Sequence, residues 1–222
     1  IVTVMTREHQ VRSFTCDQIH NALMAQIQIL ENRSGYVSIN WNFLPSAGAS
    51  LPHPHLQGLA DPVPSTLPMK YISGSQDYFL QHGRSWWLDL CRSEAASERF
   101  LNGLNLFWYA HPVPVGEKEI RCVLPGVTIS DFKDSVGSFA SDLVRVLDFY
   151  QDIGHGAWNL SVFFGQEKER EYFSAFAILI ARINPNPLST SDTAFMERLH
   201  LEPVVLTLPE DIGRLWRNNS RS

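Results

Sequence analysis

Two histidines and a glutamine lie close together in the segment His53-Pro54-His55-Leu56-Gln57. Successive side chains of an extended chain point to opposite faces, so His53, His55 and Gln57 can share one face. Pro54 favours this extended conformation, because it fixes its own φ and disfavours helix for the residue before it. A neutral imidazole can attack phosphorus and hold a nucleotidyl group, whose oxygens a glutamine amide can bond. The segment therefore predicts a site for nucleotidyl transfer.

The residues that precede this segment are small. Gly48, Ala49 and Ser50 allow the backbone to approach a phosphate closely, and Asn42 and Ser50 are candidate phosphate contacts. The alternative is that Asn42 and Ser50 serve turn formation and that the histidines are half-exposed residues of a strand. A lone histidine favours that alternative. The small-residue turn, the two histidines and the glutamine together favour a site.

The segment from Asn42 to Gln57 resembles the active-site motif of galactose-1-phosphate uridylyltransferase and its relatives in the histidine-triad superfamily. In that family an Asn stands eleven residues before the first His of Gly-Cys-Ser-Asn-Pro-His-Pro-His-Gly-Gln, as Asn42 stands before His53. Ala49 replaces the Cys of many members and Leu56 replaces the Gly, variants that also look like the dinucleoside-polyphosphate phosphorylase branch. The resemblance implies an α+β, HIT-like fold with duplicated strand-helix-strand-strand units and antiparallel half-barrel sheets.

The resemblance also implies roles for individual residues. His55, the second histidine of the pair, is the expected nucleophile, with one ring nitrogen free and the other held by an acceptor such as a backbone carbonyl. Gln57 would bond the phosphoryl oxygens. His53 and His9 match residues that complete a zinc site begun by two cysteines in an N-terminal segment of the family. Two imidazoles cannot close a tetrahedral zinc site alone, so a structural role for both histidines is the alternative.

The composition describes an ordinary globular protein. The chain has 222 residues, of which 44% are hydrophobic and 18% charged, enough for one large domain or two small ones. A net charge of −5 offers no basic surplus for nucleic acid or membrane surfaces. Three separated cysteines, Cys16, Cys91 and Cys122, indicate free thiols in a reducing compartment, so we expect a cytoplasmic protein. No apolar run has the length of a membrane span, and no signal peptide opens the chain.

Hydrophobic periodicity divides the chain into two similar units joined by a helical connector. Residues 1–66 form the N-terminal HIT-like unit with the histidine motif; it opens inside a strand without an initiator Met, so we expect an earlier part to be missing. We expect strands over 1–5 and 36–43 and at the histidines, and a helix capped by Ser13 or Thr15. The connector, 67–103, is expected to hold a helix over 69–91, broken near Gly83. The unit 104–222 is expected to contain strands over 104–109, 118–124, 157–164 and 171–183, a helix that stops at Gly154, and short helices over 193–199 and 209–216.

The second unit echoes the first, because Trp158-Asn159 matches Trp41-Asn42. It lacks the histidine pair that holds a second metal in the uridylyltransferases, so we expect that metal site to be absent. This half would then be structural or complete the substrate pocket. Arg12 and Lys118 are candidates for neutralising a substrate phosphate, although surface roles are favoured for both.

The sequence therefore predicts a nucleotidyltransferase that moves a nucleoside monophosphate through a nucleotidyl-histidine intermediate, with ping-pong kinetics. The expected partners are a nucleoside diphosphate sugar or dinucleotide and a phosphate acceptor, in a monomer or a homodimer. Zinc would be structural, and no organic cofactor is expected. A phosphorylase or hydrolase with the same intermediate is one alternative, and a degenerate, non-catalytic nucleotide-binding member is another.

Overall fold

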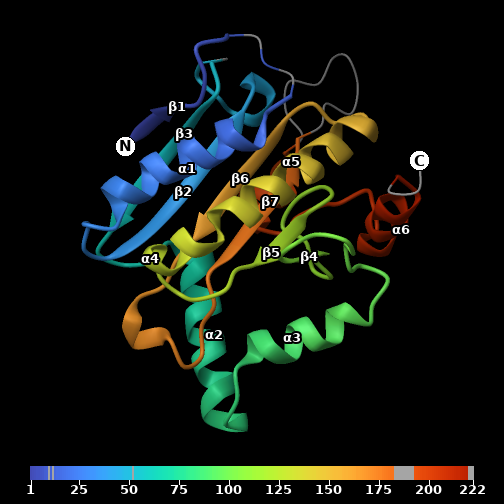
Figure 1. Cartoon of the computed structure of the whole chain (residues 1–222). Helices are drawn as coiled ribbons and strands as arrows, with labels where there is room; N and C mark the ends of the chain where they lie inside the picture. The colour runs from blue at the N-terminus through green and yellow to red at the C-terminus, as the bar shows by residue number, and fades with distance from the viewer. Residues whose placement is uncertain (10, 12, 52, 183–192, 220–222) are drawn as a thin grey trace.

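The described part of the protein forms one continuous antiparallel sheet flanked by helices (Figure 1). The computed structural model describes residues 1–9, 11, 13–51, 53–182 and 193–219. Arg12, a candidate phosphate contact, therefore lies outside the described residues, as does residue 183 of the last predicted strand. The strands are β1 (Val2–Val4), β2 (Tyr36–Phe43), β3 (His55–Asp61), β4 (Phe107–Ala110), β5 (Ile120–Val123), β6 (Trp158–Phe163) and β7 (Phe176–Ala181).

The helices come from both predicted units and from the connector between them. A π-helical turn, Met196–His200, stands where the sequence predicts a short helix, and 3₁₀ turns lie at Pro45–Ala47, Lys133–Ser135 and Glu167–Glu169. The α-helices of the described residues are α1 (Cys16–Leu30), α2 (Thr66–His82), α3 (Trp86–Ala95), α4 (Ile129–Phe132), α5 (Val136–Asp152) and α6 (Pro209–Asn219).

The sheet has an internal two-fold arrangement that follows the duplicated sequence. Its order is β1-β3-β2-β6-β7-β5-β4. Strands β1, β3 and β2 follow one another from one edge to the centre, and β5, β7 and β6 repeat this order from the other side, inside the edge strand β4. The inner strands β2 and β6 meet at the centre, where Asn42 lies opposite Asn159. Because Trp41-Asn42 and Trp158-Asn159 are the matching residues of the two units, this asparagine pair marks the axis. The predicted α+β fold with two strand-helix-strand-strand units is confirmed.

Helices α1 and α5 lie side by side across one face of the sheet (Figure 1). The alternating residues of β2 that face them are buried, and Trp41 packs edge-on to Trp158 with ring centroids 5.6 Å apart. Helix α1 begins with a capping box, in which the Thr15 hydroxyl accepts from the Gln18 N–H at 3.2 Å. This confirms Thr15 as one of the two predicted caps. The apolar stripe of α1 is buried in full: Ile19, Leu23, Ile27 and Leu30.

The opposite face of the sheet has two different halves. Over β5 and β7 it packs against α2 and α3 through an apolar cluster that includes Ile72, Trp87 and Phe176. Over β2 and β3 it carries half-buried polar side chains, among them Asn40 and Gln57. The half over β5 and β7 is therefore closed by helices, whereas the half over β2 and β3 presents polar groups.

Two predicted element boundaries in the second unit are wrong. The strand expected over 171–183 begins only at Phe176, because the N–H groups of Tyr172 and Phe173 donate to the Glu169 carbonyl and close a turn. The strand expected over 104–109 is β4, which begins only at Phe107. It begins late because the Asp142 carboxylate of α5 accepts hydrogen bonds from the N–H groups of residues 105 and 106 at 2.8 Å each. The helix expected over 69–91 is two helices, as its predicted break indicated: α2 ends where Gly83 takes φ 65°.

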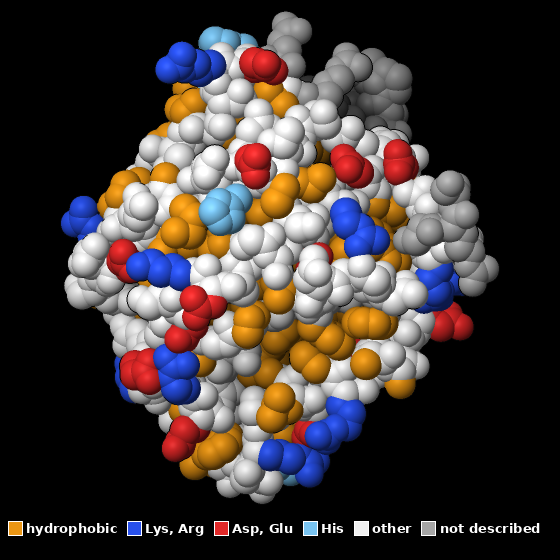
Figure 2. All heavy atoms as spheres, in the orientation of Figure 1, with side chains coloured by type: hydrophobic (Ala, Val, Ile, Leu, Met, Phe, Trp, Pro, Cys, Tyr) orange, Lys and Arg blue, Asp and Glu red, His pale blue; other side chains and the backbone are white. Residues whose placement is uncertain are grey.

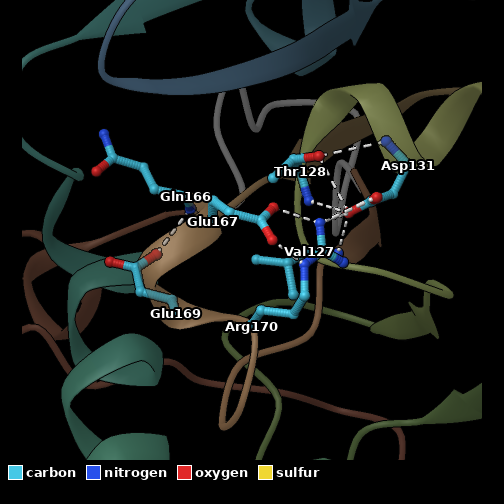
Figure 3. A network of polar contacts seen from close by, with 7 residues as sticks. All are labelled: Val127, Thr128, Asp131, Gln166, Glu167, Glu169 and Arg170. Atoms are coloured by element: carbon cyan, nitrogen blue, oxygen red, sulfur yellow. Dashed lines mark hydrogen bonds and ion pairs between the residues drawn. The ribbon is translucent and has the colours of Figure 1, made fainter.

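A network of polar contacts holds the turn before β7 against the start of α4 (Figure 3). Asp131 accepts from the N–H groups of Val127 at 2.9 Å and Thr128 at 2.8 Å, and from the Arg170 guanidinium at 3.1 Å. Burial alone would raise the pKa of Asp131, but these hydrogen bonds and the arginine outweigh it and lower the pKa to about 2. The carboxylate therefore stays charged at neutral pH and anchors this loop.

The surface of the face covered by α1 and α5 carries acidic and basic side chains mixed together (Figure 2). Within the described residues no helix is long and apolar enough to cross a membrane. Cys16, Cys91 and Cys122 are free thiols, as expected.

Candidate functional site

The ring of His55 is held by the backbone of its own motif. His55 is the first residue of β3, and its Nδ1 donates to the carbonyl oxygen of His53 at 2.8 Å. A carbonyl only accepts, so the proton must lie on Nδ1 and the lone pair on Nε2. The side chain is 9% exposed, so the surrounding chain holds the ring in place. The lone pair of Nε2 could therefore act as a base or a nucleophile.

His53 holds the chain that precedes β3 in position. It lies two residues before the first residue of the strand. Its Nε2 donates to the Thr6 carbonyl at 2.6 Å, and the adjacent Met5 N–H donates to the Pro54 carbonyl at 3.1 Å. These bonds fasten the loop after β1 to the histidine motif and fix the carbonyl that holds the His55 ring.

Gln57 lies two residues along β3 from His55 and on the same face of the sheet. The intervening Leu56 is buried on the other face, against α1. Gln57 pairs with Asn40 of β2, whose amide Nδ2 donates to the Gln57 carbonyl at 3.2 Å. The side chain of Gln57 is half-buried, so its amide can donate to a group that His55 engages.

The small residues before the histidines form a tight turn. Gly48 takes φ 85°, which glycine adopts readily, and its N–H donates to the Pro45 carbonyl at 2.9 Å. The Ala49 N–H donates to the Leu44 carbonyl at 3.2 Å. These two N–H groups close the turn, so the exposed hydroxyl of Ser50 is the donor that this run offers to an anion.

Asn42 belongs to a chain of side-chain hydrogen bonds across the centre of the sheet. The Nδ2 of Asn159 donates to the Oδ1 of Asn42 at 2.6 Å and to the Ala47 carbonyl at 2.8 Å. The Oδ1 of Asn159 accepts in turn from the Nη1 of Arg182 at 2.9 Å. Asn159 thus connects Asn42, which is a predicted phosphate contact, to the turn before Gly48 and to Arg182 of the second unit. Sequence reasoning assigned no role to Asn159 or Arg182, although the repeated Trp-Asn dipeptide was the signal for Asn159.

His9 and His53, the two candidate zinc ligands, are brought together by the fold. Their rings meet edge to face with centroids 4.6 Å apart. The Nε2 of His53 is already bonded to the Thr6 carbonyl, so its Nδ1 is the nitrogen that could bind a metal. Among the described residues no third His, Cys, Asp or Glu joins them to form a metal-binding group. The described chain alone therefore does not fit a four-coordinate zinc site.

Lys118, a further candidate, and the buried His111 both have structural partners. Lys118 forms an ion pair with Glu117 at 2.8 Å, and both side chains are largely buried. Glu117 also accepts from the N–H of Leu206 at 2.7 Å. His111 is buried, and its Nδ1 meets the backbone of Val113 at 2.8 Å. Burial and the nearby Arg121 lower the pKa of His111 to about 3, so its imidazole is neutral at pH 7.

Comparisons with known proteins agree with this architecture. No family model matches the chain. An uncharacterized protein of Archaeoglobus fulgidus is 21% identical over 221 residues, which cover 96% of this chain and 67% of that protein. A uridylyltransferase structure is similar with a TM-score of 0.84 and 17% identity, over 99% of this chain and 74% of its own.

A second group of similar structures comes from Arabidopsis thaliana. An ADP-glucose phosphorylase with bound ADP-glucose has a TM-score of 0.77 and 19% identity, over 97% of this chain and 72% of its own. A galt-like protein has a TM-score of 0.79 and 19% identity, over 97% of this chain and 74% of its own. The resemblance predicted from the histidine motif is thereby confirmed in the fold, and the chain has the HIT-like fold of the uridylyltransferases.

Proposed function

We propose that this protein is a nucleotidyltransferase in which His55 becomes covalently nucleotidylated. The observation that carries the proposal is the hydrogen bond from His55 Nδ1 to the His53 carbonyl, 2.8 Å long. It leaves the lone pair on Nε2 and prevents the ring from turning over. A nucleophile that is oriented in advance loses less entropy on reaching the transition state.

The first half-reaction forms a phosphorus–nitrogen bond. Nε2 of His55 attacks the α-phosphorus of a nucleoside diphosphate sugar or a dinucleotide. The bond from that phosphorus to the bridging oxygen breaks, and the electron pair leaves with the departing phosphate. The imidazole ring becomes cationic because Nδ1 keeps its proton, and the His53 carbonyl stabilises that charge through the same hydrogen bond.

The second half-reaction returns the ring to its neutral form. An oxygen of the acceptor phosphate attacks the same phosphorus, the Nε2–phosphorus bond breaks, and the electron pair returns to Nε2. Both steps need charge neutralisation and alignment more than proton transfer. The two half-reactions share one enzyme intermediate, so the kinetics are ping-pong.

The remaining site residues would hold the nucleotidyl group. Gln57, on the same face as His55, would donate its amide to a non-bridging oxygen as negative charge develops there. The phosphate would be contacted on its other side by Asn42, by Ser50 and by the turn at Gly48 and Ala49. The hydrogen bond between Asn159 and Asn42 orients the Asn42 amide for this role.

The similar structures support this chemistry at the level of reaction class. One is a uridylyltransferase and another an ADP-glucose phosphorylase with bound ADP-glucose. For this chain we propose a nucleoside diphosphate sugar as the donor and a sugar phosphate or inorganic phosphate as the acceptor. A phosphorylase or hydrolase would use the same nucleotidyl-histidine. A non-catalytic nucleotide-binding protein is the alternative that the labelling experiment below excludes or establishes.

The remaining properties are proposals as well. Zinc could bind at His9 and His53 only if further ligands come from outside the described residues, and its role would be structural. We propose a cytoplasmic protein, monomeric or homodimeric, that binds neither nucleic acid nor membranes.

The experiment is covalent labelling. The full chain is incubated with UDP-glucose and, separately, with ADP-glucose, each carrying ³²P at the α-position. We expect acid-labile label on the wild-type protein and on the control His82→Ala, which alters an exposed residue at the end of α2. We expect none on His55→Ala. Wild-type protein that takes no label from either donor would contradict the enzymatic proposal and favour nucleotide binding without catalysis.

A further inference from the structure

Three uncharged polar side chains form a row across the sheet beside the histidine motif. Asn40 of β2 pairs with Gln57 of β3 on one side and with Ser161 of β6 on the other. The alternate residues of these strands are buried in the core beneath α1 and α5, so the row lies on the opposite face, which carries His55. Neighbouring strands lie about 4.8 Å apart, so Asn40 stands one spacing from Gln57 and Ser161 stands two.

The amide of Asn40 is held in one orientation. Its Nδ2 carries two hydrogens, which donate to the Ser38 hydroxyl at 3.0 Å and to the Gln57 carbonyl at 3.2 Å. These two bonds determine which way the amide faces and leave Oδ1 as an acceptor. Asn40 is half-buried, so this oxygen is open to a donor that approaches the face.

The side chains at the two ends of the row are available to a ligand. Within the part of the chain that the structure describes, neither Gln57 nor Ser161 makes a side-chain hydrogen bond, and both are half-buried. An amide and a hydroxyl can each donate and accept. The row therefore offers donors and acceptors without charge. The next pair on the same face, Asn42 and Asn159, is uncharged as well.

This chemistry fits the hydroxyl groups of a sugar. Hydroxyls donate and accept and carry no charge, so amides and a serine match them. An anion would be bound best by a cationic side chain, and none of the three residues of the row is charged. The adjacent row consists of Leu59, Ser38 and Phe163. Its two apolar side chains can pack against the C–H groups of a sugar.

We propose that Gln57, Asn40 and Ser161 form the floor of a sugar subsite. Asn40 Oδ1 accepts from one sugar hydroxyl, and the Ser161 hydroxyl bonds another. A sugar is joined to its phosphate through one ester oxygen, so a phosphate held at Gln57 places the sugar over the other two residues. The ribose of the nucleotide and the hexose of the donor share this chemistry. The place of the phosphate rests on the proposed function, whereas binding of a sugar phosphate to the row does not.

The first test measures binding without catalysis. UMP, AMP and glucose 1-phosphate are titrated calorimetrically into the full chain. Each carries one sugar and one phosphate, and none has the phosphoanhydride that nucleotidylation of His55 requires. We expect Ser161→Ala to bind the ligand that uses the row roughly 2- to 10-fold more weakly, as loss of one hydrogen bond predicts. Weaker binding of UMP or AMP identifies the ribose, and weaker binding of glucose 1-phosphate identifies the hexose.

Further variants separate contact with the ligand from a structural role. Ser161→Thr keeps the hydroxyl and should bind as wild type does. The matched control is Ser141→Ala, which alters a half-buried serine of α5 on the other side of the sheet. Ser161→Ala should melt at the wild-type temperature, because no described residue bonds that hydroxyl. Asn40→Ala should weaken binding and also lower the melting temperature, because its amide holds β3.

Two results of the titrations would overturn the proposal. One is wild-type protein that binds none of the three ligands. The other is Ser161→Ala protein that binds all of them as tightly as wild type does.

The second test places the row in the reaction. With α-³²P-labelled UDP-glucose or ADP-glucose, Ser161→Ala should raise the KM for labelling of His55 roughly 2- to 10-fold and leave the maximal rate unchanged, because the sugar is bonded before and during transfer. An unchanged KM for the donor that labels the wild type would exclude the row from the reacting site. Absence of label on the wild type would instead refute the proposed function, and the titrations would then decide the sugar subsite alone.

Discussion

The position of one proton determines what His55 can do. Its Nδ1 proton is committed to the His53 carbonyl, so reaction is directed to Nε2. The neighbouring His53 is itself held by the Thr6 carbonyl. The ring of His55 is therefore fixed by the backbone of His53, and the two histidines differ in their contacts. In the proposed mechanism His55 is the nucleophile, whereas His53 fixes the loop that orients it.

Gln57 provides the sharpest test of charge stabilisation at a single residue. We expect Gln57→Ala to slow nucleotidylation of His55 by about 100-fold, because removal of one donor to a developing negative charge has an effect of that size. The melting temperature should change little, because the side chain is only half-buried. The initial rate of label incorporation is the measurement. Gln28→Ala, on the exposed side of α1, is the control and should label at the wild-type rate. Equal rates for Gln57→Ala and wild type would remove Gln57 from the site.

At the scale of elements, β3 is positioned by its close approach to α1. Gln26 of α1 is fully buried, and its amide donates to the Thr3 hydroxyl at 2.9 Å and the Leu56 carbonyl at 3.3 Å. These bonds connect the helix to β1 and β3 on the side opposite His55. A Cβ atom at Gly58 would lie 2.1 Å from Gln26 Oε1, so glycine is what permits this contact.

We therefore expect Gly58→Ala to reduce the free energy of unfolding by about 1–3 kcal/mol, since either Gln26 or the strand must move. Urea denaturation measures the effect. Gly74→Ala is the matched control: Gly74 lies inside α2, and an added Cβ would meet nothing within 4 Å. This control should be stabilised by about 0.5–1 kcal/mol. A Gly58→Ala protein as stable as wild type would show that β3 does not depend on this packing.

Local sequence patterns predict the elements whose boundaries are set locally. Helix α1 begins at its Thr15 cap, and α2 ends at Gly83, because capping and left-handed glycine act over a few residues. The start of β7 could not be predicted in this way. It depends on a turn at Glu169, whose side chain accepts from the Tyr36 hydroxyl, 133 residues away in the chain, at 2.6 Å.

At the scale of the whole molecule, the duplicated fold brings Asn159 and Arg182 of the second unit to Asn42 of the first. His55 and Gln57 are candidates from the sequence because they lie within one short motif. The connection of Arg182 to Asn42 through Asn159 could not be predicted, because it depends on the pairing of β2 with β6 and of β6 with β7. That pairing places Asn159 between Asn42 and the arginine. The second unit has no histidine in the described β7.

The proposed mechanism depends most on one bond, between phosphorus and Nε2 of His55. The measurement is to nucleotidylate the full-length protein, locate the modified residue by peptide mass spectrometry, and identify the substituted nitrogen by ¹⁵N–³¹P correlation NMR. We expect a single adduct on Nε2 of His55, because Nδ1 is held by the His53 carbonyl. An adduct on Nδ1 of His55, on His53 or on any other residue would contradict it.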